Sequence, residues 1–394
     1  MTEYLRLALQ FGAGNIGRGF LGELFHRAGY KIVFVEKNEK LVEEMNQRGS
    51  YTLEIVGPVR FERYEINEIM AIKAGDQKRI NQEIAATNIA AISVGVAGLP
   101  EVASILAEGL KERCRAQAPA LNIIMAENVL KGEELLYQML AKNMDRETRK
   151  YLDEKVGLVQ AVVSRMVPVI SQEIKEKDPL YIKAEEYGEL PVDKRAFKGS
   201  IPVIAGIKPY DHFEVYEERK IFIHNTGHAL AAYFGFLKGY EFIYEAMGDG
   251  WIRDKVRMAL KEIGQAMIKK HPFLSRDLEG HIEDLLRRFG NQALADTIKR
   301  VARDPLRKLK PEERLVGAGR LIERYGGDPG AIGLGISACL LYDEESDESS
   351  QELQHMLRQK GIAGVLRGIC GLEPQENLYH LVEQGLKELG EIKK

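Results

Sequence analysis

A glycine-rich turn near the start of the chain constrains the fold more than any other feature of the sequence. Residues 5–11 (LRLALQF) have the composition of a buried strand, and they run into the sequence GAGNIG at 12–17. A helix is expected from about residue 15 to 28, and the apolar residues 32–35 form a second strand that ends on Glu36. Strand, G-x-G-x-x-G, helix, strand and acid follow one another as in a dinucleotide-binding βαβ unit. We therefore expect an N-terminal Rossmann domain rather than an ordinary glycine-rich turn of a parallel sheet.

Each part of this unit has a physical role in holding a dinucleotide. Gly12 permits the tight turn, Gly14 lets the backbone approach a pyrophosphate, and Gly17 lets the helix pack against the sheet. The helix directs its first N–H groups and the positive end of its dipole at the phosphates. Glu36 can accept hydrogen bonds from the adenosine ribose and would repel a 2′-phosphate, which favours NAD over NADP. The residues expected to contact NAD are Ala8, Leu9, Gln10, Phe11, Gly12, Ala13, Gly14, Asn15, Ile16, Gly17, Arg18, Gly19, Glu36 and Gly95.

The size and composition of the chain are those of a two-domain globular protein. Its 394 residues exceed what one hydrophobic core usually holds. A net charge of −3 would not attract nucleic acid or an anionic membrane, and the sequence contains no apolar run of 18 residues. We therefore expect neither nucleic acid nor membrane as a partner. Cys114, Cys339 and Cys370 lie far apart in the sequence, which fits a reducing cytoplasm and indicates no zinc site.

Two regions of different periodicity follow the first βαβ unit. Strands alternate with helices at first, a β-hairpin around Gly57-Pro58 is inserted, and the segment 180–207 breaks into short alternating runs. From about residue 208 long helical patterns dominate. We therefore predict a Rossmann domain with a β extension over residues 1–207 and an all-α domain over 208–394. The expected elements are helices at 38–49, from 99, 218–237, 251–270, 277–289, 292–303, 311–325, 329–340 and 353–367, strands at 51–55, 59–61, 89–94, 121–125 and 158–163, and a solvated acidic loop at 341–352.

The residues best suited to chemistry open the second domain, in the sequence KIFIHNTGH at 220–228. At about 100° per residue, Lys220, His228 and Asn225 lie at about 0°, 80° and 140°, so all three can face one site. A desolvated lysine can remove an alcohol proton, and an asparagine amide can stabilise the alkoxide that develops. Composition alone favours a surface lysine and a buried structural histidine over this interpretation. His224 and His228 have the spacing of a metal pair, but the sequence indicates no third ligand.

Four motifs together resemble those of the polyol-specific long-chain dehydrogenases, the mannitol dehydrogenase family. Residues 11–20 (FGAGNIGRGF) resemble the opening of these enzymes, and residues 220–228 match the family's K-x-x-x-x-N-x-x-H motif. Asn128 follows a Rossmann strand where the family has a substrate-site asparagine, and residues 303–308 (RDPLRK) resemble its R-D-P-x-R-K signature. The family commonly has aspartate where this chain has Glu36, and NAD remains the expected cofactor.

The resemblance implies a metal-independent, NAD-linked oxidation of mannitol 1-phosphate to fructose 6-phosphate, and the reverse reaction. It gives Lys220 the role of general acid/base, and it gives Asn225 and Asn128 the stabilisation of the oxyanion. His228 would orient the lysine or hold the substrate. The expected partner is therefore a small sugar phosphate, and we expect a cytoplasmic monomer or homodimer.

A phosphorylated substrate needs a cationic anchor, and arginine binds phosphate bidentately. The expected phosphate contacts are Arg303, Arg307 and Lys308. The arginines share one stripe if the helix continues past the proline that follows Asp304, but a break at this aspartate is equally compatible with the sequence. The alternative is a structural basic helix end that pairs with the acids at 312–313.

Two other functions are compatible with the sequence. A dehydrogenase of the same family could act on unphosphorylated mannitol or on a hexuronate such as fructuronate, although the short chain and the basic cluster favour a phosphorylated substrate. A non-catalytic NAD-binding sensor would keep the glycine turn but would not need Lys220, Asn225 and His228 together. The acidic stretch at 341–352 has no functional interpretation from the sequence.

Overall fold

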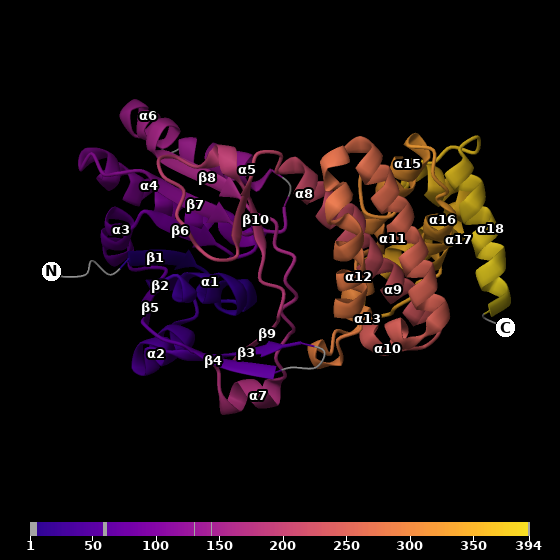
Figure 1. The fold of residues 1–394 in the computed structure, drawn as a ribbon, viewed down its shortest axis with the longest axis horizontal. Coiled ribbons are helices and arrows are strands. Elements are labelled where there is room, and N and C mark those ends of the chain that lie inside the picture. Colours follow the sequence, from indigo (N-terminus) through magenta and orange to yellow (C-terminus); the bar gives the residue numbers. More distant parts are fainter. Residues whose placement is uncertain (1–5, 58–60, 130, 143, 393–394) are drawn as a thin grey trace. The chain divides into compact units, whose positions relative to one another are not determined.

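The chain forms two compact units. A computed structural model of the protein describes residues 6–57, 61–129, 131–142 and 144–392. The first unit comprises Met1–Tyr216 and the second Glu217–Lys394. Figure 1 shows strands flanked by helices in the first unit and a set of helices in the second. The predicted fold class, a Rossmann domain followed by an all-α domain, is confirmed.

A six-stranded parallel sheet forms the centre of the first unit. Its strands are β1 (Arg6–Phe11), β2 (Tyr30–Glu36), β5 (Ile69–Lys73), β6 (Ile89–Ile92), β7 (Leu121–Met125) and β8 (Val156–Gln160). They lie in the order β5-β2-β1-β6-β7-β8, and each neighbouring pair is parallel. β2 and β6 lie on opposite sides of β1, so the carboxyl ends of β1 and β6 form the topological switch point at which such sheets bind ligands.

Both faces of this sheet are covered, as the nearly continuous apolar sequence of its strands predicts. Successive residues of β1 point to opposite faces: Ala8 packs in one hydrophobic cluster with Phe20, and Leu9 packs in another with Ile80. The helices of this unit are α1 (Gly22–Arg27), α2 (Glu39–Arg48), α3 (Gln77–Ala86), α4 (Leu99–Arg115), α5 (Gly132–Ala141), α6 (Arg146–Lys155) and α7 (Gln172–Lys177), and α8 (Glu214–Arg219) crosses into the second unit. β5, α3, α5, α6 and α7 were not predicted from the sequence.

The helix after the glycine turn begins at Asn15 and passes through a π-helical turn, Gly17–Leu21, before α1. Tyr51 explains this distortion. Its hydroxyl donates to the backbone oxygen of Arg18 (2.7 Å), and the N–H of Gly22 donates five residues back instead of four. A Cβ on Gly22 would lie 2.3 Å from the tyrosine hydroxyl, so only glycine fits there. The predicted helix is therefore present, with an irregular turn that the local sequence did not indicate.

Two small sheets extend the first unit. One consists of β3 (Tyr51–Val56), β4 (Phe61–Ile66) and β9 (Ile182–Glu185), and the other of β10 (Leu190–Asp193) and β11 (Ile207–Tyr210). The antiparallel pair β3–β4 confirms the predicted hairpin, although its turn at 58–60 lies outside the described residues. β9 pairs with β3 in parallel, so the segment 180–207 contributes strands to the first unit as predicted.

The described part of the second unit is helical. Its helices are α9 (Thr226–Leu237), α10 (Ile243–Gly248), α11 (Gly250–Lys270), α12 (Leu278–Phe289), α13 (Ile298–Ala302), α14 (Pro305–Lys308), α15 (Val316–Arg324), α16 (Gly330–Leu340), α17 (Glu348–Gly368) and α18 (Asn377–Ile392). The expected helices at 251–270, 277–289 and 329–340 are confirmed. The continuous helix expected at 292–303 is wrong, because Ala295 adopts a left-handed conformation (φ 46°) and Thr297 caps a new, short helix.

The acidic stretch 341–352 is not the solvated loop that its composition suggested. Tyr342 and Ser350 are fully buried, and the Ser350 hydroxyl donates to the backbone oxygen of Tyr342 (3.1 Å). Asp347 accepts the N–H of Ser349 and so caps the first turn of α17 within the stretch. Acidic side chains therefore cover a segment that is packed into the unit.

Candidate active site

The glycine turn after β1 has the backbone shape that a dinucleotide requires. Gly12 has a φ of +89°, and a Cβ there would lie 2.6 Å from the backbone oxygen of Ser93. A Cβ on Gly17 would lie 2.1 Å from the backbone oxygen of Gly12, so the helix packs directly on the turn. At Gly14 no atom lies within 4 Å of the Cβ position. Open space therefore lies over the turn where a pyrophosphate would approach the backbone, and these residues fit NAD.

Glu36 connects the glycine turn to the turn after β2. Its Oε2 accepts the N–H of Ala13 (2.8 Å), and its Oε1 accepts the N–H groups of Lys37 and Asn38 (both 2.9 Å). A carboxylate has about four acceptor positions, so Glu36 retains capacity for a ribose hydroxyl. The Glu36 side chain thus stabilises the glycine turn and also places a negative charge beside it.

A pocket of about 150 Å³ lies at the switch point of the sheet. Its polar wall contains Gly12, Gly14, Glu36, Lys37 and Ser93. Its apolar wall contains Val35, Val102 and Ile105. An apolar cleft with a few polar groups at its rim is typical of small-molecule and cofactor sites. The pocket therefore suits the adenosine end of a dinucleotide.

Glu127 joins the carboxyl ends of β6 and β7. Its buried carboxylate accepts the N–H groups of Val94 (2.7 Å) and Gly95 (2.9 Å). Burial raises the pKa of Glu127, while these two hydrogen bonds oppose the increase. The next residue, Asn128, is exposed at the end of β7. Glu127 thus fixes the backbone that carries both Gly95 and Asn128.

Some residues that the sequence analysis grouped with the cofactor support the turn from behind. Ala8 and Leu9 are fully buried in the core of the sheet. Arg18 is also buried: its Nε donates to the backbone oxygen of Ala13 (2.6 Å) and its Nη1 to that of Leu180 (2.8 Å). These side chains stabilise the turn from the protein side. They do not line the pocket.

The predicted catalytic residues open the second unit on another π-helical turn. Residues Lys220–Asn225 are π-helical, and α9 continues from Thr226. In such a turn residue i+5 follows residue i by about one turn, so Lys220 and Asn225 project from the same side. A regular α-helix would separate them by about 140°. The carboxamide of Asn225 makes no hydrogen bond with another described residue, and π-helical turns occur frequently at functional sites.

Lys220 is adapted to exchange a proton near neutral pH. Burial and the positive charge of Arg314 lower the pKa of Lys220 to about 8, while Glu217 opposes the decrease. The backbone of Arg314 is held against the π-helical turn, because the hydroxyl of Thr226 lies 2.6 Å from its backbone oxygen and 3.2 Å from that of Ile221. A lysine with this pKa is present in both protonation states at physiological pH.

His228 stacks on an aromatic ring and lies beside an acid. The rings of His228 and Phe289 are 4.7 Å apart and nearly parallel, at 15°. Nε2 of His228 lies 3.1 Å from Oδ2 of Asp296, whose side chain is 8% exposed. Arg300 donates to both carboxylate oxygens of Asp296 (2.6 and 2.5 Å). Burial raises the pKa of Asp296, but His228 and Arg300 outweigh burial and lower this pKa to about 2.

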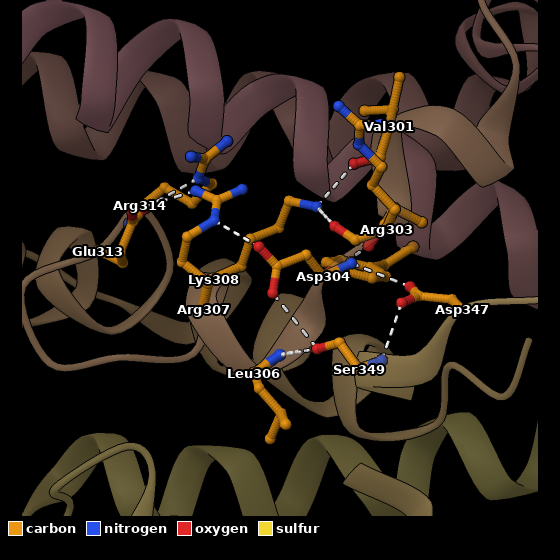
Figure 2. A network of polar contacts seen from close by, with 12 residues as sticks. Val301, Arg303, Asp304, Leu306, Arg307, Lys308, Glu313, Arg314, Asp347 and Ser349 are labelled. Carbon is orange, nitrogen blue, oxygen red and sulfur yellow. Dashed lines mark hydrogen bonds and ion pairs between the residues drawn. The ribbon is translucent and has the colours of Figure 1, made fainter. Parts of the chain in front are cut away.

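The basic segment predicted to hold phosphate is broken at Asp304 (Figure 2). α13 ends before this residue, Asp304 has a φ of +62°, and Pro305 begins α14, so the arginines do not form one helical stripe. Arg303 is exposed. Arg307 donates to Asp304 (2.5 Å) and to Glu313 (3.3 Å). The contact with Glu313 is one of the pairings expected if this segment is a structural basic helix end.

Lys308 is buried in the same turn. Its ammonium donates to the backbone oxygens of Val301 (2.8 Å) and Arg303, as Figure 2 shows. Burial lowers the pKa of Lys308 to about 7. From the acidic stretch, Asp347 accepts the N–H of Asp304 (2.9 Å). Lys308 and Asp347 thus hold the left-handed conformation at Asp304 from two sides.

Family models cover nearly the whole chain. The mannitol dehydrogenase Rossmann domain matches residues 6–206, and the mannitol dehydrogenase C-terminal domain matches residues 212–389. The chain belongs to the mannitol dehydrogenase family. This result confirms the resemblance found in the sequence motifs, and it makes the protein an oxidoreductase with a Rossmann domain.

Two relatives in the mannitol dehydrogenase family match almost end to end. The mannitol-1-phosphate 5-dehydrogenases of Bacillus licheniformis and Bacillus subtilis are 36% and 37% identical to this chain, over 97% of it and 100% of their own length. The structure of Pseudomonas fluorescens mannitol 2-dehydrogenase, a ternary complex with NAD and D-mannitol, has a TM-score of 0.78 at 19% identity, with 99% of this chain and 93% of that chain covered. A substrate-free D-sorbitol dehydrogenase has a TM-score of 0.82 at 19% identity, with 100% and 97% covered. These two structures share the fold.

Three residues that contact or interact with predicted site residues of their own unit were absent from the sequence predictions: Glu127, Asp296 and Arg314. Glu127 immediately precedes Asn128, so an acid at the end of a buried strand was the available signal. Asp296 and Arg314 come from segments that follow α12 and α14, and only the fold brings them to His228 and Lys220.

The structure also bears on metals and membranes. Among the described residues, no three His, Cys, Asp or Glu side chains gather as a metal site. The rings of His224 and His228 lie 6.1 Å apart, and burial lowers the pKa of His224 well below its usual value. No helix in the described ranges is long and apolar enough to cross a membrane.

Proposed function

We propose that this chain catalyses the NAD-linked interconversion of mannitol 1-phosphate and fructose 6-phosphate. The two Bacillus relatives named mannitol-1-phosphate 5-dehydrogenase support this substrate pair. The observation that carries the proposal is Lys220, with a pKa lowered to about 8, on a π-helical turn that directs Asn225 to the same side. A polyol dehydrogenase needs such a base next to a hydrogen-bond donor.

The first unit holds NAD in this proposal. Gly14, where the backbone faces open space, would hold the pyrophosphate, and Glu36 in the adjoining pocket would hold the adenosine ribose. The N–H groups at the start of the following helix favour the phosphate charge. When bound, NAD accepts a hydride from the carbinol carbon, and NADH returns it. The negative charge of Glu36 disfavours a 2′-phosphate, so we propose NAD rather than NADP as the cofactor.

Lys220 acts as general acid/base at the substrate hydroxyl. In oxidation its neutral amine takes the hydroxyl proton as the hydride leaves the carbon, and in reduction its ammonium returns that proton. Asn225 and Asn128 donate amide hydrogen bonds to the substrate oxygen, which stabilise the negative charge that develops there. His228, beside Asp296, orients the lysine or the substrate.

The basic segment of the second unit holds the substrate phosphate. Arg303 is exposed, and Arg307 keeps its Nη2 unused by the acids that fix its other nitrogens. The ammonium of Lys308 already donates to two backbone oxygens, so this residue contributes by fixing the turn. Charge-assisted hydrogen bonds from arginine to phosphate are about twice as strong as neutral ones.

The decisive test is the oxidation of NADH with fructose 6-phosphate, fructose and fructuronate, measured side by side with the same enzyme. Two charge-assisted contacts to phosphate are worth about 1.5–3 kcal/mol each, so kcat/KM for fructose 6-phosphate is expected to exceed that for fructose by at least ~10²-fold. A preference for fructose would indicate a mannitol 2-dehydrogenase. A preference for fructuronate would indicate a hexuronate reductase, and NADH binding without turnover of any substrate would indicate a sensor.

A further inference from the structure

The guanidinium of Arg314 has unused donors in a nearly buried position. Its side chain is 12% exposed, and its Nε donates to Oε2 of Glu313 (3.1 Å). Its terminal nitrogens, Nη1 and Nη2, donate to no other described residue. Neither nitrogen is among the fully buried, unpartnered side-chain atoms of the described residues, so both reach solvent and are open to a bound anion.

Arg307 completes a pair of guanidinium groups on Glu313, as Figure 2 shows. Its Nη1 lies 3.3 Å from Oε1 of Glu313, while Arg314 uses Oε2, and its Nε is held by Asp304. One carboxylate thus fixes two planar groups next to each other and leaves terminal N–H groups on both. Asp304 and Glu313 offset the positive charges of the two arginines. An anion would therefore be held by hydrogen bonds from the terminal N–H groups and not by a net positive charge.

This arginine pair lies beside the proposed acid/base. Thr226 connects the two elements, since its hydroxyl contacts the backbone oxygens of Arg314 (2.6 Å) and Ile221 (3.2 Å). Ile221 follows Lys220 directly in the π-helical turn. The positive charge of Arg314 also acts on Lys220, so the guanidinium is near enough to the amine to meet the anionic end of a substrate whose hydroxyl is at Lys220.

We propose that Arg314, together with Arg307, binds the phosphate of the substrate and that Glu313 fixes both guanidinium groups for this purpose. The chemical class recognised is a phosphomonoester, because two planar forks match its oxygens bidentately. The inference rests on the proposed function and changes its anchor: Arg314 was not predicted from the sequence, and the ammonium of Lys308 is used by the backbone.

Substitution of Arg314 tests this assignment. Arg314→Met keeps an apolar stem and removes the guanidinium, and Arg314→Lys keeps the charge but not the fork. Lys310→Met removes an exposed charge from the same segment and serves as a control. We expect KM for fructose 6-phosphate to rise by ~10–150-fold in Arg314→Met and by less in Arg314→Lys. Because loss of Arg314 also raises the pKa of Lys220 and so changes turnover with every substrate, the readout is the ratio of KM for fructose 6-phosphate to KM for fructose, which should rise by the same factor. We expect KM for NADH in all variants, and all constants of the control variant, to change by less than about threefold.

Three results would overturn the proposal. An equal rise in KM for fructose and for fructose 6-phosphate in Arg314→Met would make the residue structural. If Arg314→Lys kept the wild-type KM, charge alone would hold the phosphate, and the bidentate recognition proposed here would be wrong. A selective rise in KM in Arg303→Met instead would move the anchor to that exposed residue.

Calorimetric titration with inorganic phosphate separates this inference from the proposed function. We expect the wild-type enzyme to bind phosphate and Arg314→Met to bind it at least ~10-fold more weakly, whether or not fructose 6-phosphate is turned over. Phosphate binding without turnover would overturn the proposed substrate pair and keep the anion site. Equal phosphate binding by both proteins would overturn the anion site, and thermal unfolding of each variant checks that it is folded.

Discussion

The carboxylate of Asp296 lies 3.1 Å from Nε2 of His228, and both side chains are largely buried. Arg300 holds the other side of the carboxylate with two hydrogen bonds, so the position of the acid is fixed. An acid in this place can orient the ring of a histidine. We therefore predict that Asp296 acts through His228, as a positioning residue.

Asp296→Asn tests this relationship, because it keeps the shape of the side chain and removes its charge. Contacts to charged groups are worth about 1.5–3 kcal/mol, so kcat should fall by at least ~10-fold, with KM for NADH unchanged. Asp254→Asn, an exposed acid on α11, is the matched control and should leave kcat unchanged. If kcat of Asp296→Asn fell only in proportion to its folded fraction, as measured by thermal unfolding, Asp296 would have a structural role alone.

A pair of glycine substitutions tests the packing behind His228. A Cβ on Gly227 would lie 3.0 Å from Leu260 and 3.1 Å from Phe289, the ring that stacks on His228, whereas a Cβ on Gly280 would meet nothing within 4 Å. Overpacking costs about 1–3 kcal/mol, and alanine in place of glycine stabilises a helix by roughly 0.5–1 kcal/mol. We expect Gly227→Ala to lower both the unfolding free energy and kcat, and Gly280→Ala to raise the unfolding free energy alone. Chemical denaturation gives the unfolding free energy of each variant, and steady-state assays give kcat. A Gly227→Ala enzyme that is more stable than the wild type would contradict this packing.

Two variants of Glu36 separate its charge from its support of the glycine turn. Glu36→Gln keeps an acceptor for the N–H of Ala13, whereas Glu36→Ala removes it. Both lose the charge that opposes a 2′-phosphate, so both should use NADP better relative to NAD. Only Glu36→Ala should also lose the turn contact, and we expect its kcat/KM for NAD to fall by ~10–150-fold from the loss of charge-assisted hydrogen bonds. Equal use of NAD and NADP by the wild-type enzyme would contradict the role of Glu36.

The elements that the sequence predicted well are those specified by neighbouring residues. Gly12, Gly14 and Gly17 have a fixed spacing after a strand, and the helix N-capped by Asn38 and ended at Gly49 follows the capping rules. The π-helical turn before α1 was not predictable in this way, because its cause is the Tyr51 hydroxyl, which arrives from β3. A local pattern cannot indicate a contact with a distant strand.

The same distinction applies to the candidate site. Lys220, Asn225 and His228 share one motif, and their spacing alone brought them together in the prediction, although the π-helical turn changes their relative directions. Lys308 looked like a phosphate ligand because charge suggests exposure, yet the fold buries it on two backbone oxygens. Arg314 has no motif of its own, and only tertiary contacts reveal it.

The measurement that tests the account most directly is the pH dependence of kcat/KM in both directions, for the wild-type enzyme and for Lys220→Met. Arg314, Glu217 and His224 are among the charged or titratable groups that interact with Lys220, and burial together with Arg314 lowers its pKa to about 8. Oxidation needs the neutral amine, so its kcat/KM should rise with pH and level off above about pH 8. Reduction needs the ammonium, so its kcat/KM should be constant below this pH and fall above it.

In Lys220→Met both rates should drop by at least ~10²-fold, and the break near pH 8 should disappear while NADH still binds. The profiles are compared above about pH 6.5, where the substrate phosphate, with a second pKa near 6, no longer changes charge appreciably. A Lys220→Met enzyme that keeps the wild-type rate, or that keeps the break near pH 8, would contradict the assignment of Lys220 as the acid/base.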